Sequence, residues 1–141
     1  MTGWLLDTNV VSELSRQGGD ARVAAWARGQ PEQRMIISVI TLAEYDKGIA
    51  ALPANAAARP RLEAAVRALE HRFAGRVLPL SDAVVRRWGR ISSAARQAGK
   101  RFPPVIDSLL AATAVEHDLT LVTRNLKDFA GTGARLFNPW R

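Results

Sequence analysis

The sequence predicts a single α/β domain in which helices cover both faces of a central, mostly parallel sheet, giving a three-layer α/β/α sandwich. Short apolar segments rich in branched residues alternate with longer segments whose apolar residues recur at helical spacing. This order is typical of parallel strands joined by helices. The length of 141 residues is that of one domain and needs no linker, and the sequence shows no internal repeat. We therefore expect residues 1–141 to form one domain.

Five short segments are expected to be strands. The first is an apolar run that ends abruptly at Asp7, and the second contains two adjacent isoleucines. Short runs of this kind, bounded by polar residues, are typical of buried strands. The expected strands are residues 4–6, 35–38, 76–80, 119–123 and 135–137.

The segments between the strands are expected to be helices bounded by capping residues and by glycine or proline. A helix over about residues 10–14 is followed by Gly18-Gly19, and Asp20 can cap a second helix that ends at residues 29–31. Thr41 and Glu44 match a capping box at the start of a helix that runs to about residue 52.

In the second half of the chain, residues 54–74 read as one helix or two, with Pro60 near a helix start. The helical spacing of residues 62, 66, 69 and 73 favours a packing stripe. Ser81 can cap a helix that ends at Gly99, and Pro103-Pro104 introduces the next helix. We interpret most arginines on the Ser81 helix as a solvated surface; they are Arg86, Arg87, Arg90 and Arg96.

The amino-acid composition excludes some classes of protein and favours others. The net charge is +7, from 20 Lys and Arg against 13 Asp and Glu, which slightly favours a polyanionic partner such as nucleic acid. Without cysteine the chain has no disulfide and no thiolate site. No apolar stretch approaches the roughly 20 residues of a membrane span, and residues 1–3 lead directly into a strand rather than a signal peptide. We therefore expect an intracellular, cytoplasmic protein without a membrane partner.

Acidic residues stand where strands end or helices begin. Asp7 follows the first strand, Asp107 lies in the first turn of a helix, and residues 123–128 follow the fourth strand. Ligands of an open α/β sheet bind outside the carboxyl ends of its strands. The alternative is structural: Asp7 could simply cap a helix, and Asp107 could simply complement a helix dipole.

An oxygen-only set of side chains suits a hard cation, Mg²⁺ or Mn²⁺, better than zinc. Clustered carboxylates repel one another, so such a cluster requires a cation when it is ionised. His71 and His117 read as ordinary surface or boundary residues, and we assign neither a catalytic role.

Four motifs occur in order along the chain. They are Leu5-Leu6-Asp7-Thr8-Asn9, then Ser38-Val39-Ile40-Thr41-Leu42-Ala43-Glu44, then Asp107 with Leu109-Leu110-Ala111-Ala112-Thr113-Ala114, and then Val122-Thr123-Arg124-Asn125 through Asp128-Phe129. Together they resemble the PIN domain, and more narrowly the VapC group of toxin ribonucleases in its FitB-like branch. The resemblance covers essentially the whole chain, including the closing residues Phe137-Asn138-Pro139-Trp140.

The resemblance implies a metal-dependent endoribonuclease with a PIN-like three-layer fold. Its first three acidic positions map onto Asp7, Glu44 and Asp107, which would hold Mg²⁺, with Mn²⁺ as a substitute. The fourth position falls at Asn125, an amide, so that Asn125 or the nearby Asp128 would complete the site and a second metal ion is in question.

Around this site, Thr8 and Thr123 could orient carboxylates or a metal-bound water. Arg124, Lys100 and Arg101 would meet the RNA backbone. The resemblance also implies a homodimer and a cognate antitoxin of the VapB or FitA kind. The antitoxin tail would cover the active-site groove, and its DNA-binding half would link the toxin to DNA only indirectly.

Two other classes remain open on the sequence alone. An aspartate-phosphorylated signalling or phosphatase domain also places an Asp after its first strand, but such phosphatases usually carry a second Asp two residues later, where this chain has Asn9. A PIN-like binding module without catalysis is favoured by Asn125 and disfavoured by the three acidic residues Asp7, Glu44 and Asp107.

Overall fold

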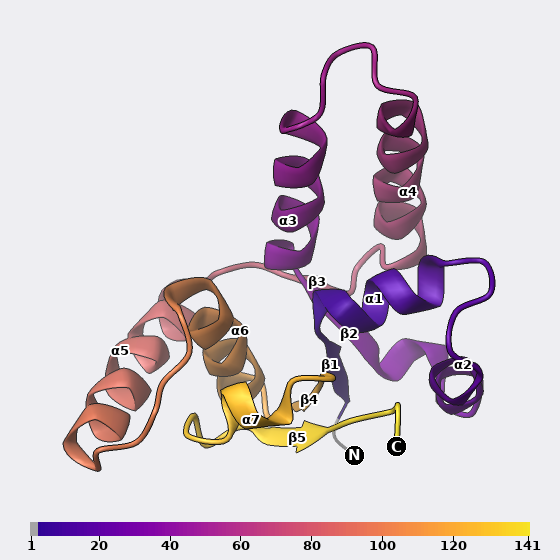
Figure 1. Ribbon diagram of the computed structural model, residues 1–141. Helices are drawn as coiled ribbons and strands as arrows, with labels where there is room; N and C mark the ends of the chain where they lie inside the picture. The colour runs from indigo at the N-terminus through magenta and orange to yellow at the C-terminus, as the bar shows by residue number, and fades with distance from the viewer. Residues whose placement is uncertain (1–2) are drawn as a thin grey trace.

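The computed structural model describes residues 3–141 and has a five-stranded, all-parallel sheet at its centre (Figure 1). The strand order is β3-β2-β1-β4-β5, so the chain starts in the middle and adds strands on both sides. The predicted α/β class with a mostly parallel sheet is confirmed. The strands are β1 (Trp4–Leu6), β2 (Met35–Ser38), β3 (Val77–Leu78), β4 (Thr120–Val122) and β5 (Arg135–Phe137).

Seven α-helices and one 3₁₀ turn connect the strands in the described residues. Two predicted caps are confirmed, because Asp20 accepts from the backbone N–H of Arg22 and Ser81 accepts from that of Val84. Pro60 lies in the first turn of a single helix. The elements are α1 (Thr8–Ser15), α2 (Ala21–Arg28), η1 (Glu32–Arg34), α3 (Val39–Ala50), α4 (Ala58–Arg72), α5 (Asp82–Gln97), α6 (Val105–Glu116) and α7 (Leu126–Phe129).

Two boundaries differ from the prediction. The capping box at Thr41 and Glu44 is wrong, because α3 begins at Val39 and its N-cap is Ser38, whose Oγ accepts from the N–H of Ile40 (3.0 Å). The third strand is two residues long instead of five. It is an edge strand, and Pro79 after it lacks the N–H that a longer ladder would use. The expectation for residues 1–3 concerns residues 1 and 2, which lie outside the described part of the chain.

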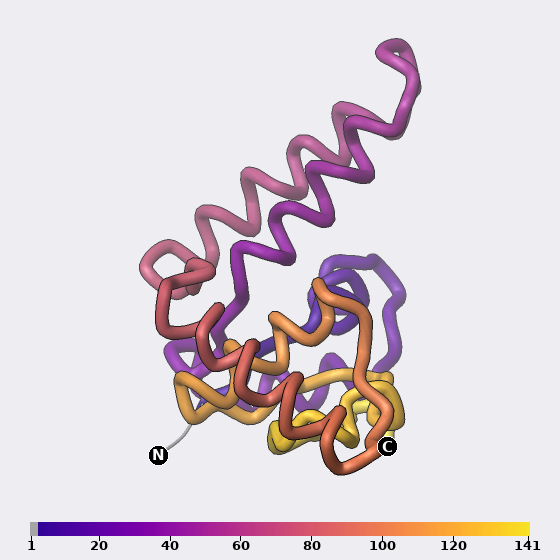
Figure 2. Tube along the Cα trace, turned by 90° about the vertical axis from the view of Figure 1, so that its left-hand side faces the viewer, coloured from indigo at the N-terminus to yellow at the C-terminus, as the bar shows by residue number. Residues whose placement is uncertain are grey.

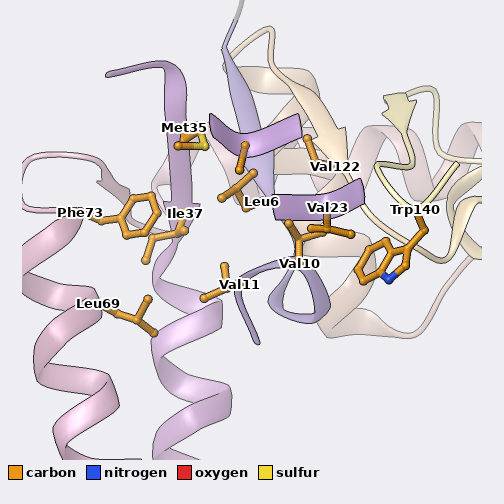
Figure 3. Close-up of a cluster of buried hydrophobic side chains, with 11 residues drawn as sticks. Leu6, Val10, Val11, Val23, Met35, Ile37, Leu69, Phe73, Val122 and Trp140 are labelled. Carbon is orange, nitrogen blue, oxygen red and sulfur yellow. The ribbon is translucent and has the colours of Figure 1, made fainter. Parts of the chain in front are cut away.

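Apolar side chains fill both sides of the sheet, as a three-layer arrangement requires. One cluster joins β1, β2 and β4 to α1, α2 and the base of α4, with Leu6 and Phe73 among its buried members (Figure 3). The other joins the sheet to α6 and α7 and contains Leu5 and Leu110. Leu5 and Leu6 point to opposite faces because side chains alternate along a strand.

Helices α3 and α4 form an arm that projects from the sheet (Figures 1 and 2). The predicted packing stripe of α4 is buried only near the base of the arm, at Leu69 and Phe73. Nearer the tip, the Arg59 guanidinium donates to the carbonyls of Ile49 and Leu52 and ties the two helices together. No helix in residues 3–141 is long and apolar enough to cross a membrane.

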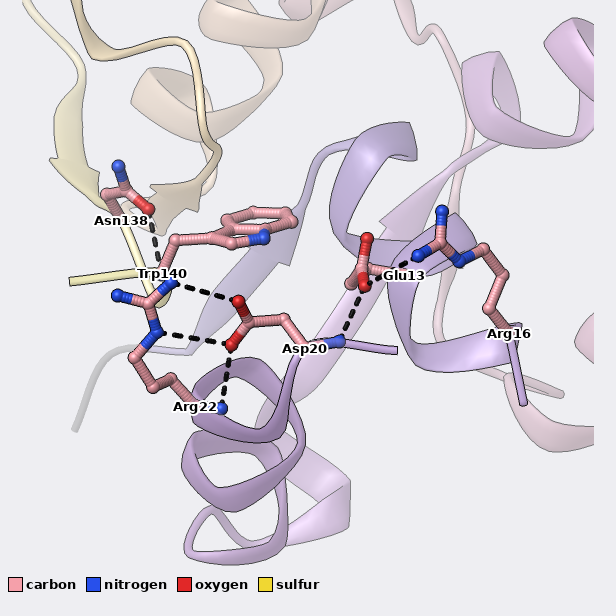
Figure 4. A network of polar contacts seen from close by, with 6 residues as sticks. All are labelled: Glu13, Arg16, Asp20, Arg22, Asn138 and Trp140. Atoms are coloured by element: carbon pink, nitrogen blue, oxygen red, sulfur yellow. Dashed lines mark hydrogen bonds and ion pairs between the residues drawn. The ribbon is translucent and has the colours of Figure 1, made fainter. Parts of the chain in front are cut away.

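The C-terminal segment closes the face that α1 and α2 cover. Asn138 Oδ1 accepts from the backbone N–H of Trp140 (2.9 Å) (Figure 4). The Trp140 side chain is buried in the first cluster (Figure 3). Close by, Asp20 accepts from the Arg22 guanidinium and backbone, and Glu13 accepts from the N–H of Asp20. The chain end is therefore packed onto the face of the sheet that α1 and α2 cover.

Candidate active site

The site lies where the central strands end. Parallel strands share one carboxyl edge, so residues that follow β1 and β4 meet there. Asp7 directly follows β1, Thr123 directly follows β4, and the N–H of Asp7 donates to the carbonyl of Val122 (2.9 Å). The pairing of β1 with β4 therefore fixes the backbone of Asp7 beside that of Thr123.

Both oxygens of Asp7 accept hydrogen bonds, and the side chain is only 8% exposed. Oδ1 accepts from the N–H of Thr8 (2.7 Å), so the alternative interpretation of Asp7 as a helix cap is confirmed. Oδ2 accepts from Thr123 Oγ1 (2.8 Å), which in turn accepts from the N–H of Asn125 (3.1 Å). The carboxylate is thus held by residues that follow two different strands, β1 and β4, and is more than a cap.

Glu44 is placed by a pair of threonines. Its Oε1 accepts from Thr8 Oγ1 (2.6 Å), and that hydroxyl lies 3.0 Å from Thr41 Oγ1. Thr41 is completely buried inside α3. The sequence predicts Thr41 as a cap and does not predict its contact with Thr8. A hydroxyl residue within an otherwise apolar helix is the signal in the sequence that points to such a buried contact.

Electrostatics connect Asp7 to the acidic residues on other elements. Burial raises the pKa of Asp7 to about 6, hydrogen bonds from Thr123 and Thr8 oppose the rise, and the charges of Asp107 and Glu44 add to it. The pKa of Asp107 is also raised, first by burial and then by Glu44 and Asp128. Asp7, which follows β1, and the acidic residues of α3, α6 and α7 therefore share one electrostatic environment.

The predicted fourth position lies beside this group. Asn125 precedes α7 and is exposed, and its backbone is tied to Thr123. Asp128 lies on α7, as expected if that segment is helical, and is half-buried; its Oδ1 lies 3.9 Å from Arg101 Nη2. Asn125 and Asp128 therefore both flank the carboxylates, from the β4–α7 junction.

The predicted RNA-binding residues are exposed near the same edge. Arg101 lies beside Asp128, and Lys100 precedes it. The Arg124 guanidinium lies over the Trp140 ring, 5.1 Å from its centroid. His117 caps the far end of α6 from Asp107, so it is remote from the acidic group.

An open hollow of about 710 Å³ adjoins the acidic group. Glu44 and Asp107 lie in its wall, and the rest of the wall is mainly apolar. Val105 is 57% exposed and Ile106 is 50% exposed at the start of α6. The carboxylates are therefore reached from an apolar, solvent-open surface.

The donor set fits a hard cation rather than zinc, because all candidate ligands are oxygens. One oxygen is unused: Asn9 Oδ1, two residues after Asp7, is buried without a hydrogen-bond partner in the described residues. In residues 3–141, no group of three or more His, Cys, Asp or Glu side chains is arranged to hold a metal ion. Mg²⁺ usually takes one or two carboxylates and completes its shell with waters and substrate phosphates, so a pair such as Asp7 and Asp107 is compatible with it.

Comparison with known proteins identifies the family. Residues 4–133 match the family model described as PIN domain. Toxin FitB of Neisseria gonorrhoeae is 37% identical over 139 residues, which cover 96% of this chain and 97% of that protein. VapC ribonuclease Y4jK of Sinorhizobium fredii is also 37% identical over 139 residues, covering 96% of each chain.

A solved structure shows the same fold. The structure of FitAB bound to a DNA fragment contains a chain that is 35% identical and superposes with a TM-score of 0.83, covering 98% of this chain and 96% of the other. The resemblance seen in the motifs is confirmed. The chain therefore belongs to the PIN domain family, among relatives that are FitB and VapC toxins.

Proposed function

We propose that this protein is a metal-dependent endoribonuclease and the toxin of a toxin-antitoxin pair. The observation that carries the proposal is the buried carboxylate of Asp7, whose pKa is raised to about 6 beside Asp107 and Glu44 at the carboxyl edge of the sheet. A buried carboxylate with acidic neighbours is a candidate metal ligand, since a cation removes the repulsion. The ribonuclease name of the VapC relative supports the same reaction class.

In this proposal, Asp7 and Asp107 bind Mg²⁺ or Mn²⁺, with Glu44 and either Asn125 or Asp128 completing the site. When bound, the ion supplies Lewis acidity for phosphodiester hydrolysis and offsets the charge of the phosphate. Glu44 is exposed and has one oxygen bonded to Thr8, so its other oxygen can orient the attacking water and accept its proton.

The threonines hold these groups in place. Thr123 fixes one oxygen of Asp7, and Thr8 fixes one oxygen of Glu44. Fixing a carboxylate through a hydrogen bond favours its ionised form and limits its rotation. Both effects prepare the side chains for a cation before RNA arrives.

The expected partners follow from the family. The FitAB structure contains FitA together with FitB on DNA, so we propose a cognate VapB- or FitA-like antitoxin, a homodimer of this chain, and contact with DNA only through the antitoxin. An antitoxin segment in the hollow beside Glu44 and Asp107 would cover the catalytic carboxylates. We place the complex in the cytoplasm.

The direct test is cleavage of a mixed cellular RNA pool by the purified, antitoxin-free chain, analysed by mapping of cleavage ends. We expect cuts at discrete positions with Mg²⁺ or Mn²⁺, no cuts with chelator, and a loss of about 10³-fold or more for Asp7→Asn, because removal of a metal ligand removes the ion's contribution.

Circular dichroism of each variant serves as the folding control. If the folded wild-type chain binds metal but cuts no RNA, the nuclease proposal is wrong and the protein is a PIN-like binding module, the alternative that Asn125 favours. Equal cleavage by wild type and Asp7→Asn would mean that Asp7 is not part of the nuclease site.

A further inference from the structure

The positive charge of the chain is concentrated in one stretch. Residues 82–101, which form α5 and the loop after it, contain six Arg or Lys and one acidic residue, Asp82. They therefore carry five of the seven net positive charges, and the remaining residues are nearly balanced, with 14 Lys and Arg against 12 Asp and Glu. A local excess of this kind is the electrostatic footprint of a surface that binds a polyanion.

The charges are arranged on the outer face of α5. Helix α5 lies beside α6 (Figure 1). On this inner face Val84 is buried, and the Trp88 indole donates to Ser108 Oγ (2.7 Å). Residues three and four apart share one face of a helix. The opposite face therefore presents a continuous row of exposed hydrogen-bonding side chains, which we call the α5 stripe: Arg86, Arg90, Ser93 and Gln97.

The α5 stripe lines a shallow, open depression of about 530 Å³, which Gly89 and Ala94 also line. The stripe spans about 16 Å at 1.5 Å per helical residue. It contains no aromatic or large apolar side chain, so it can hold a chain of phosphates but offers no platform for bases.

Little of this charge is neutralised within the molecule. Arg86 lies 3.8 Å from Asp82, and both side chains are well exposed, so the pair is weak. Arg87 points toward α6, where it pairs with Glu116 (3.0 Å). In the described part of the chain, acidic partners are absent for Arg90, Arg96 and Lys100.

The basic stretch ends at the acidic site. After Gly99 the chain turns back, and Arg101 reaches Asp128 (3.9 Å) four residues before the start of α6. Gly131 lies against this loop so closely that a side chain there would overlap the carbonyl oxygen of Arg101. Asp107 follows in the first turn of α6. The loop therefore connects the α5 stripe to the carboxylates.

We propose that the α5 stripe, continued by Lys100 and Arg101, binds the phosphate backbone of the RNA substrate and leads it to the carboxylate site. This inference rests on the ribonuclease function proposed above. A ribonuclease with this site must bind RNA although its carboxylates repel the RNA phosphates. Basic side chains along the path of the RNA to the site offset this repulsion. Contact with phosphates alone makes this part of the binding independent of sequence.

The test is RNA binding by the double variant Arg86→Ala/Arg90→Ala, measured by fluorescence anisotropy with a labelled single-stranded RNA of mixed sequence and roughly 20 nucleotides, in chelator to prevent cleavage. Each lost phosphate contact lowers the slope of log affinity against log salt by about 0.7 for single strands. We expect the slope to fall by about 1.4 and the affinity at low salt to fall about tenfold or more. Both sites are exposed and alanine favours helices, so folding should persist.

The matched control is Arg61→Ala/Arg67→Ala, which removes the same charge from exposed positions of α4. Equal effects of the two double variants would overturn the proposal, since only net charge would then matter. Arg86→Lys/Arg90→Lys keeps the charge and should keep the slope. Unchanged RNA binding together with lost binding of a polyglutamate peptide would assign the surface to an acidic protein segment instead.

The same preparations separate this inference from the function on which it rests. A wild-type chain that neither binds nor cuts RNA would overturn both. A wild-type chain that binds and cuts RNA, beside an α5 variant that behaves like the α4 control, would overturn only the role of the α5 stripe.

Discussion

Asp7→Asn is expected to stabilise the metal-free protein at neutral pH while it removes cleavage. The pKa of Asp7 is raised from 3.8 to about 6, chiefly by burial. Ionising a group against a shift of two units costs about 3 kcal/mol. Asparagine has the same shape, remains neutral and can still accept from Thr8 or Thr123. We therefore expect its free energy of unfolding in chelator at pH 7.5 to exceed that of the wild type by up to about 3 kcal/mol, measured by urea denaturation.

The pH dependence has a definite sign. Between pH 3.8 and about 6, Asp7 stays protonated in the folded state but ionises in the unfolded state. The folded state then binds more protons, so wild-type stability falls as pH rises through this window. The advantage of Asp7→Asn should be absent below pH 3.8, grow up to about pH 6 and stay constant above it.

Metal should reverse the order of stability. An ion that binds only the folded wild type at 1,000 times its dissociation constant adds about 4.1 kcal/mol, which exceeds the expected advantage of Asp7→Asn, and Asp7→Asn should gain much less. Exposed Asp46→Asn on α3 serves as the control and should show neither effect. Equal stability of wild type and Asp7→Asn in chelator at pH 7.5 would show that Asp7 carries no electrostatic cost and would weaken its role as a metal ligand.

The strands and the position of Asp7 could be predicted because each depends on local sequence. A buried strand needs a short apolar run, and the residue after it must lie at the sheet edge. The four strands other than β3 agree with expectation within two residues. The position of Asp107 could be predicted for the same reason. Pro103-Pro104 and the apolar run after them predict the start of a helix, which places Asp107 in the first turn of α6.

The start of α3 could not be chosen from local sequence because two hydroxyl residues compete for the cap. Ser38 and Thr41 both suit an N-cap, and Glu44 three residues after Thr41 favoured the wrong one. The sheet determines where α3 begins, because β2 ends at Ser38 and the helix follows directly. Thr41 is then inside the helix, with its hydroxyl beside that of Thr8. Glu44 therefore faces the site from the second turn of α3 and not from its start.

Contacts between segments that are distant in the chain could not be predicted from the sequence either. The bond from Thr123 to Asp7 joins residues 116 positions apart, and the pKa of Asp7 depends on Asp107 and Glu44 on other elements. The positions of the acidic residues predict a cluster of carboxylates, but burial, which is the main cause of the raised pKa, is a property of the assembled fold. The concentration of charge on α5 was visible in the sequence, whereas its outward orientation and its return to Asp128 were not.

Thr123→Val is expected to impair cleavage without disturbing the fold strongly. Valine has nearly the same shape as threonine, but it removes the hydroxyl that donates to Asp7 Oδ2 (2.8 Å) and accepts from the N–H of Asn125 (3.1 Å). The bond to Asp7 favours the ionised carboxylate, so its loss raises the pKa of Asp7 above about 6 and weakens metal binding. We expect kcat/KM at pH 7 to fall about 10- to 100-fold, and the acidic limb of the pH–rate profile to move to higher pH.

The shift of the acidic limb of the pH–rate profile distinguishes an effect of Thr123 on the pKa of Asp7 from a simple loss of packing. Thr113→Val is the matched control, because Thr113 is equally buried but donates to the carbonyl of Leu109 within its own helix. Its variant can lose stability, yet its acidic limb should stay in place. Thr123→Ser keeps the hydroxyl and should restore the wild-type profile. If Thr123→Val lowered kcat/KM equally at every pH, the bond would position Asp7 without tuning it, and the metal affinity of the variant would then match that of the wild type.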